Sequence, residues 1–114
     1  MWYIIMAEPN SAFLETFGDA PLIRVLDFLL CEGLMFDYPL TEIANHSKVS
    51  WSTINRIFPE LVRQGIVKPT RKIGRAQLYQ LNRDSPKVMA LLELDKKLSQ
   101  TLAEKVLEEQ TQPA

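Results

Sequence analysis

Hydrophobic residues recur at helical spacing through the first half of the chain. The strongest stripe follows positions i, i+3, i+4 and i+7 and consists of Leu22, Val25, Leu26 and Leu29. It predicts a helix with one core-facing side. This helix begins near Pro21, with Asp19 or Ala20 as its cap, and stops at Gly33. A shorter helix is expected over residues 11–17.

Two further helices with a tight connection follow. The first starts near Pro39 and is short. Ser50 is expected to cap the second, because its hydroxyl can accept a hydrogen bond from a free backbone amide. The second helix ends at Gly65 and contains Pro59, which removes one backbone hydrogen bond. The expected inward residues are Leu40, Ile43 and Ala44, then Ile54, Ile57 or Phe58, Leu61 and Val62.

The hydrophobic period changes after this helix. Residues 66–68 and 77–81 are rich in β-branched and aromatic side chains, which is typical of short strands. Gly74 can supply a positive-φ turn between them. Pro69 interrupts the first strand, so we expect an edge strand in a two-stranded hairpin with nothing paired outside it.

The composition limits the classes of protein to which the chain can belong. The chain has 114 residues, of which 46% are hydrophobic, enough for one domain with a core. Cys31, the single cysteine, rules out an internal disulfide and predicts a cytoplasmic location; we expect it in the core. The apolar run at residues 2–6 is too short for a membrane span or a signal peptide. Met6 is a second candidate start.

Charge is strongly segregated behind a net charge of −1. Residues 1–47 hold one basic and seven acidic residues, whereas residues 48–83 hold eight basic residues and one acidic residue. A basic block of this kind is expected where a phosphate backbone docks, although an ordinary solvated face is the alternative.

The sequence therefore predicts a mainly α fold with a small β-hairpin. A short helix, a tight turn and a second helix form a helix-turn-helix, and the basic hairpin after it makes a winged helix. The expected division is an N-terminal segment with a short helix (1–19), a winged helix-turn-helix DNA-binding domain (20–83), a C-terminal dimerisation helix (84–110) and a flexible tail (111–114).

Four runs of sequence carry a family resemblance: Leu40–Ala44, Lys48–Ile57, Leu61–Val67 and Gly74–Asn82. Together they resemble the winged helix-turn-helix signature of MarR- and ArsR-like prokaryotic regulators, and of archaeal members in particular. The resemblance covers about residues 20–107. It implies a sequence-specific transcriptional regulator that binds double-stranded DNA as a homodimer.

On this interpretation the helix over residues 50–64 enters the major groove, and the wing over residues 68–77 follows the backbone or the minor groove. Asn55 can pair with adenine and Arg56 with guanine or a phosphate. Trp51 either faces DNA or packs on the preceding helix. The expected DNA-binding residues are Lys48, Ser50, Trp51, Ser52, Thr53, Asn55, Arg56, Lys68, Arg71, Lys72 and Arg75, with Arg71 or Arg75 nearest the tip of the wing.

A long apolar stripe predicts the dimer interface. Ser85 and Pro86 suit the cap and first position of a helix that runs to about residue 109. Its stripe consists of Val88, Leu91, Leu94, Leu98, Leu102 and Val106. Two-fold pairing would set two recognition helices about 34 Å apart on a palindromic operator. The alternative is a helix folded back over its own domain, against Phe13 and Phe17.

The sequence contains few residues that could support another class of function. His46 and Cys31 are too few for a metal site, and no phosphate-binding glycine loop or catalytic set is present, so we expect no enzyme, cofactor or metal. A winged-helix protein–protein module of the transcription machinery is the main alternative. A third hypothesis is an unidentified small-molecule effector, held between the dimer helices and the core by phenylalanines and Met35.

Overall fold

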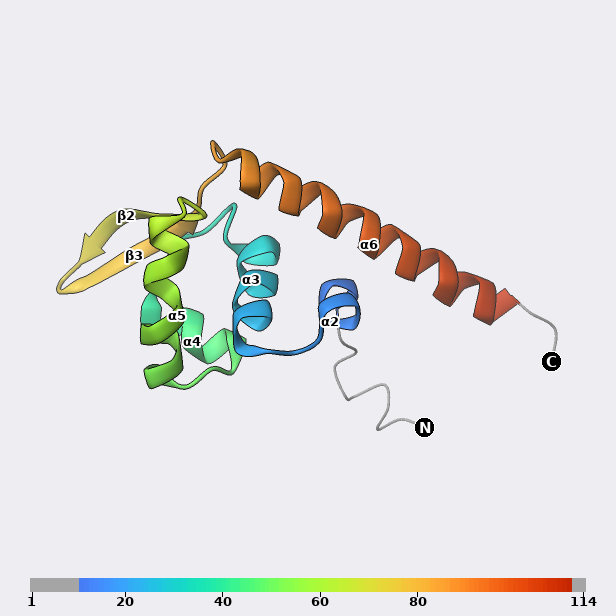
Figure 1. Cartoon of the computed structure of the whole chain (residues 1–114), viewed down its shortest axis with the longest axis horizontal. Coiled ribbons are helices and arrows are strands. Elements are labelled where there is room, and N and C mark those ends of the chain that lie inside the picture. The colour runs from blue at the N-terminus through green and yellow to red at the C-terminus, as the bar shows by residue number, and fades with distance from the viewer. Residues whose placement is uncertain (1–10, 112–114) are drawn as a thin grey trace.

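A computed structural model describes residues 11–111 as a mainly helical chain with one small antiparallel sheet and a long C-terminal helix (Figure 1). The elements are α2 (Ala12–Phe17), α3 (Pro21–Glu32), β1 (Tyr38–Pro39), α4 (Leu40–Ser47), α5 (Trp51–Arg63), β2 (Val67–Ile73), β3 (Ala76–Leu81) and α6 (Pro86–Thr111). The predicted order of elements is confirmed, with β1 added. Residues 1–10 and 112–114, which include Met6, its apolar run and most of the predicted tail, lie outside the described residues.

Serine hydroxyls cap three of the helices. Ser11 accepts from the Leu14 amide at 3.1 Å at the start of α2. Ser50 accepts from the Thr53 amide at 3.2 Å, which confirms it as the cap of α5. Ser85 accepts from the amide three residues on at 3.4 Å, one residue before α6 begins. Each hydroxyl satisfies an amide that has no partner within its helix.

The core lies between α3, α4, α5, the sheet and the first turn of α6. Its fully buried side chains are Val25, Leu29, Ile43, Ile54, Val67, Leu81 and Val88. Of the two alternatives in α5, Phe58 is buried and Ile57 packs at the edge of the core. Leu22 and Val62 were expected inside but are 40% and 37% exposed. Both lie in end turns of their helices, where fewer neighbouring elements cover them.

The sheet has the strand order β1-β3-β2. β2 is an edge strand, as Pro69 predicted. The expectation that nothing pairs outside the hairpin is wrong, because β1 pairs with β3 through Tyr38↔Tyr79 and Pro39↔Leu78. Two residues are too few to produce a recognisable strand pattern. Gly74 has a φ of +62°, and Ile73 pairs with Ala76 across the turn, so the hairpin closes with the positive-φ residue that was expected.

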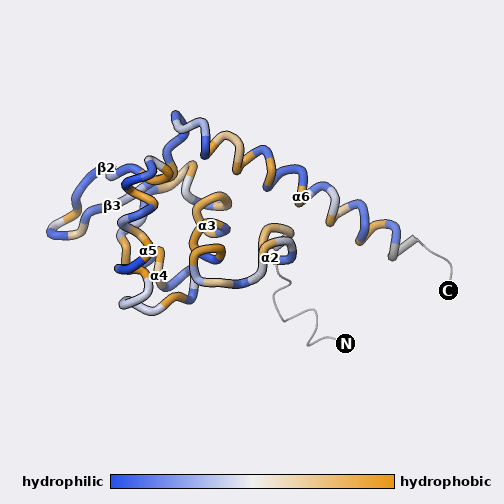
Figure 2. Tube along the Cα trace, in the orientation of Figure 1, coloured by the Kyte–Doolittle hydropathy of each residue, from blue (hydrophilic) through white to orange (hydrophobic). Residues whose placement is uncertain are grey.

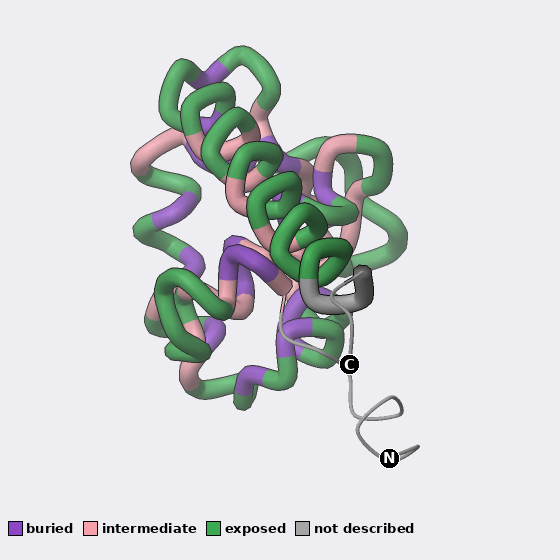
Figure 3. Tube along the Cα trace, turned by 90° about the vertical axis from the view of Figure 1, so that its right-hand side faces the viewer, coloured by how far each residue is buried: buried purple, intermediate pink, exposed green. Residues whose placement is uncertain are grey.

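α6 gives the molecule its elongated shape, with a longest dimension of 57 Å (Figure 1). It leaves the domain at an angle, contacts α3 and α2 on the way, and is mostly exposed toward its C-terminal end (Figure 3). No helix within residues 11–111 is both long enough and apolar enough to cross a membrane.

Candidate nucleic-acid interface

The first turns of α5 carry a cluster of exposed polar and aromatic side chains. Trp51 is 54% exposed and shares the lining of one groove with Leu40 and Thr41 of α4, so it is not buried against that helix. Ser52, Asn55 and Arg56 are also exposed. They lie opposite Ile54, Phe58 and Leu61, the buried side of the helix, which is the arrangement that the helical period predicts.

Arg24 fixes the turn that precedes α5. Its Nε donates to the Ser47 carbonyl at 2.9 Å and its Nη2 to the Lys48 carbonyl at 3.0 Å. A third bond joins Nη1 to the Asp19 carbonyl at 2.5 Å. Lys48 caps α4 with a φ of +58°, a left-handed conformation that costs a non-glycine residue energy. The guanidinium therefore stabilises a strained turn and sets where α5 begins.

Four of the predicted contact residues, Ser50, Ser52, Thr53 and Asn55, already have side-chain hydrogen bonds at the start of α5. The Thr53 hydroxyl lies 2.8 Å from the Ser50 hydroxyl, within the cap. The Asn55 amide nitrogen donates to the Trp51 carbonyl at 2.8 Å. Asn55 must therefore turn outward before it can pair with a base edge, whereas Arg56 forms no side-chain bond with any residue in the described range.

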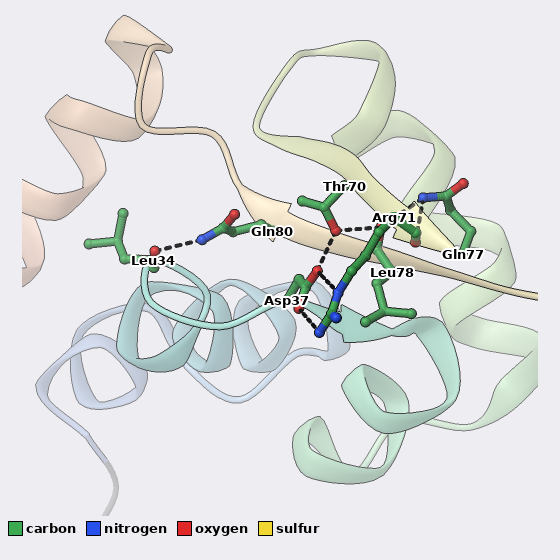
Figure 4. A network of polar contacts seen from close by, with 7 residues as sticks. All are labelled: Leu34, Asp37, Thr70, Arg71, Gln77, Leu78 and Gln80. Carbon is green, nitrogen blue, oxygen red and sulfur yellow. Dashed lines mark hydrogen bonds and ion pairs between the residues drawn. The ribbon is translucent and has the colours of Figure 1, made fainter. Parts of the chain in front are cut away.

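An ion pair ties the hairpin to the rest of the domain (Figure 4). Arg71 Nε lies 3.0 Å from Asp37 Oδ2, and the Thr70 hydroxyl donates to the same oxygen at 2.6 Å. These hydrogen bonds, Arg71 first and then Thr70, lower the pKa of Asp37 below its usual value. Gln77 and Gln80 add bonds to backbone carbonyls on either side. Arg71 is thus committed to positioning the hairpin.

A groove separates the start of α5 from the hairpin. It has a volume of about 220 Å³ and is lined by Thr41 of α4, Trp51 of α5, and Arg75 and Gln77 of the hairpin, among others. Lys72 pairs directly with Gln77, so both side chains lie on the same face of the sheet. Lys68 instead pairs with Gln80 and lies on the opposite face.

Hydrogen bonding divides the eight basic residues of the 48–83 block into two groups. Three are engaged: Arg63 with Glu60, Arg71 with Asp37 and Arg83 with the Leu34 carbonyl. The other five form no ion pair or side-chain hydrogen bond within residues 11–111, and we call them the unpaired cations: Lys48, Arg56, Lys68, Lys72 and Arg75. All five are exposed.

The apolar stripe of α6 is divided between two roles. Val88 is fully buried within its own domain, so its assignment to a dimer interface is wrong. Leu91 and Leu98 are partly buried against the same core. Leu94 and Val106 are 38% and 43% exposed. The helix thus folds back over its own domain at its beginning, which was the alternative expectation, and leaves that domain further along.

The outer half of α6 forms an apolar groove with α2. The groove has a volume of about 440 Å³ and is lined by Ser11, Ala12, Ser99, Leu102, Ala103, Val106 and Leu107. Leu102 and Val106, which were predicted for the dimer interface, therefore share a surface with α2.

The small-molecule effector stays a hypothesis, and the side chains named for it differ in burial. Met35 is 73% exposed, and Phe13 and Phe58 lie in the core. A hollow of about 770 Å³ lies beside α3 and α4; Phe28 and Cys31 are among its lining residues, and no residue of α6 is. The expectation of a buried Cys31 is wrong, because its side chain is exposed. Partial desolvation, followed by nearby carboxylates, raises the pKa of Cys31 to about 11, so the thiol stays protonated at neutral pH.

Sequence reasoning missed the two groups that position the site. Arg24 was visible only as the single basic residue of an acidic segment, and Asp37 as one acidic residue in a loop. Apart from the Asp19 carbonyl, their partners lie more than twenty positions away along the chain. Comparison with protein-family models and with curated proteins gave no match to this chain. No group of three or more potential metal ligands is present within residues 11–111.

Proposed function

We propose that the protein is a DNA-binding transcriptional regulator with a winged-helix fold, which binds double-stranded DNA as a homodimer. In this proposal α5 is the recognition helix and the β2–β3 hairpin is the wing. The observation that carries it is the set of unpaired cations on the α4–α5 turn, α5 and the wing. Cations without protein partners can neutralise phosphates directly, whereas Arg63 and Arg71 must first leave their carboxylate partners.

The groove between α5 and the wing suits one strand of a DNA backbone. Trp51 and Arg75 lie on its two sides, so a strand seated between them would have α5 in the major groove and the wing over the neighbouring minor groove. Arg56 is available for guanine or a phosphate, and Asn55 for adenine once it turns outward. The free amides at the start of α5 add to the attraction for phosphate.

The homodimer is supported by the outer half of α6. Leu94, Val106 and Leu107 remain 38–60% exposed. Exposing apolar side chains to water along one helix does not stabilise an isolated domain, so these side chains suit an interface. Two-fold pairing there would present two copies of α5 to the same side of a duplex. We therefore assign the interface to the region from Leu94 onward and to the groove beside α2.

The second candidate function is a protein–protein interaction module. It is supported by exposed apolar side chains behind the wing, where Phe36 and Ile73 are 55% and 57% exposed and line a groove of about 400 Å³. A module of this class does not require unpaired cations around α5. Their presence favours DNA.

Fluorescence anisotropy with random-sequence duplex DNA over a series of salt concentrations tests the proposal. The protein should bind at low salt and weaken steeply as salt rises, because each neutralised phosphate releases about one counterion. Arg56→Ala with Arg75→Ala should weaken binding and reduce the salt slope by about one unit for each phosphate that the variant no longer neutralises.

The matched control is Arg83→Ala with Lys87→Ala, which removes the same charge from exposed positions outside α5, the hairpin and the proposed interface. It should leave the salt slope unchanged. If both double variants changed the DNA affinity and the salt slope equally, the net charge of the protein, and not the position of the cations, would determine DNA binding. Absence of binding at the lowest salt would reject the proposal and direct attention to a protein partner.

A further inference from the structure

One side chain at the tip of the hairpin does not fit its surroundings. Ile73 is 57% exposed and does not belong to the hydrophobic core or to the side chains packed against it. The hairpin around it is hydrophilic, with a short hydrophobic segment at its tip (Figure 2). Its neighbours Lys72 and Arg75 are both unpaired cations.

The turn holds Ile73 at the end of the molecule. Gly74 and Arg75 form a two-residue turn, in which Gly74 has a φ of +62° and Arg75 is not left-handed. This pattern matches a type II′ turn, whose twist suits a rigid two-residue hairpin. Ile73 pairs with Ala76, the smallest residue of β3, so no large side chain shields it from across the turn.

Strand propensity alone does not explain an isoleucine here. Threonine is also β-branched and would serve the strand equally well without exposing apolar surface to water. An exposed isoleucine at a hairpin tip, with a lysine before it and an arginine two residues after it in the sequence, is instead a combination that suits minor-groove binding. In such binding, cations neutralise the groove, and an apolar side chain enters between two base pairs and partly unstacks them.

We propose that Ile73 is a wedge that enters the minor groove beside Arg75 and partly unstacks one base-pair step. The inference rests on the proposed function, because it takes the hairpin as a DNA-contacting wing. Pyrimidine–purine steps such as TA and CA unstack most easily. Ile73 therefore adds a preference for such a step at a fixed distance from the bases that α5 contacts, and it bends the duplex.

The test uses duplexes recovered from a random pool by the wild-type protein. The adenine of each TA or CA step is replaced in turn by 2-aminopurine, whose fluorescence rises when its stacking partners move away. Wild-type protein should raise the fluorescence at one step in each half-site. Ile73→Thr should abolish that rise and weaken binding by roughly fivefold, the reduction expected for about half of an isoleucine's burial. The salt slope should not change, because no charge is removed.

Met35→Thr is the matched control, since Met35 is 73% exposed but belongs to the loop between α3 and β1 and not to the hairpin. It should leave both the fluorescence and the affinity as in the wild type. The backbone amide NMR signals of Lys72 and Gln77 should be the same in Ile73→Thr as in the wild type. This result would show that the hairpin is intact.

Three results would overturn the inference. If the wild-type protein binds duplexes without any rise in fluorescence, or if Ile73→Thr keeps the rise, the wedge is rejected while DNA binding stands. In that event the apolar groove behind the hairpin is better explained as a protein contact. If the wild-type protein binds no duplex at all, the proposed function fails and the wedge fails with it.

Discussion

Arg24 lies far along the sequence from α5, yet it holds the turn from which α5 starts. Its three hydrogen bonds go to backbone carbonyls. Every residue has a backbone carbonyl, so the sequence does not show which of them Arg24 binds. The same holds for Asp37, whose partner Arg71 was predicted to contact DNA. Residue types on the surface of α5 could be predicted from helical period, but the residues that position them could not.

We expect Arg24→Met to lower the free energy of unfolding by about 1–2 kcal/mol, because it removes three charged hydrogen bonds to backbone carbonyls, one of them partly buried. DNA binding should weaken as well, since the α4–α5 turn is no longer clamped. Urea denaturation and anisotropy measure the two effects. Arg63→Met is the control, because its ion pair with Glu60 is exposed and contributes little. Equal stability of the two variants would contradict the positioning role of Arg24.

Asp37 makes the attachment of the wing depend on pH. Its hydrogen bonds hold its folded-state pKa below the value of about 3.9 expected in an unfolded chain. The ion pair therefore stabilises the wing fully above that value, and the stabilisation is lost as the pH falls through the lowered pKa.

In Asp37→Asn, the NMR signal of Arg71 Nε should lose its pH dependence below about pH 4, and hydrogen exchange in the hairpin should be faster at neutral pH. Asp84→Asn, at an exposed site, should change neither. An unchanged hairpin in Asp37→Asn would show that the ion pair does not position the wing.

At the scale of elements, the helices and the hairpin followed from local signals. Ser50 and Ser85 as caps, Gly74 at the turn and Pro69 at the sheet edge each act through their immediate backbone. β1 did not, because a two-residue strand is defined only by its pairing with β3. The division of α6 also depends on tertiary contacts, since its stripe continues from a buried Val88 to residues outside the domain.

The two halves of α6 should respond differently to mutation. Val88→Ala should lower the free energy of unfolding by about 1–3 kcal/mol through a cavity in the core. Val106→Glu with Leu107→Glu should leave the fold intact and separate the proposed dimer, because it places charge on the exposed part of the stripe. Sedimentation velocity and thermal unfolding distinguish these outcomes. A double variant that sediments as the wild type would exclude this part of α6 from the interface.

At the scale of the whole molecule, charge and shape separate two regions. The unpaired cations belong to the α4–α5 turn, α5 and the hairpin, whereas the exposed Val106 and Leu107 belong to the outer part of α6, which extends to the other end of the long axis (Figure 1). The sequence predicted the basic segment from its charge blocks, and the apolar one separately from the stripe of α6. It could not predict that only five of eight basic residues are available, because pairing with Asp37, Glu60 and the Leu34 carbonyl is a property of the folded chain.

The most direct test of the central claim is an NMR titration of ¹⁵N-labelled wild-type protein with random-sequence duplex DNA at low salt. We expect the largest amide shifts from Lys48 to Arg56 and from Lys72 to Gln77, with α2 and the outer half of α6 unaffected, and reversal of the shifts when salt is raised. Shifts confined to the acidic residues of α3 and α4, or no shifts at all, would contradict the account.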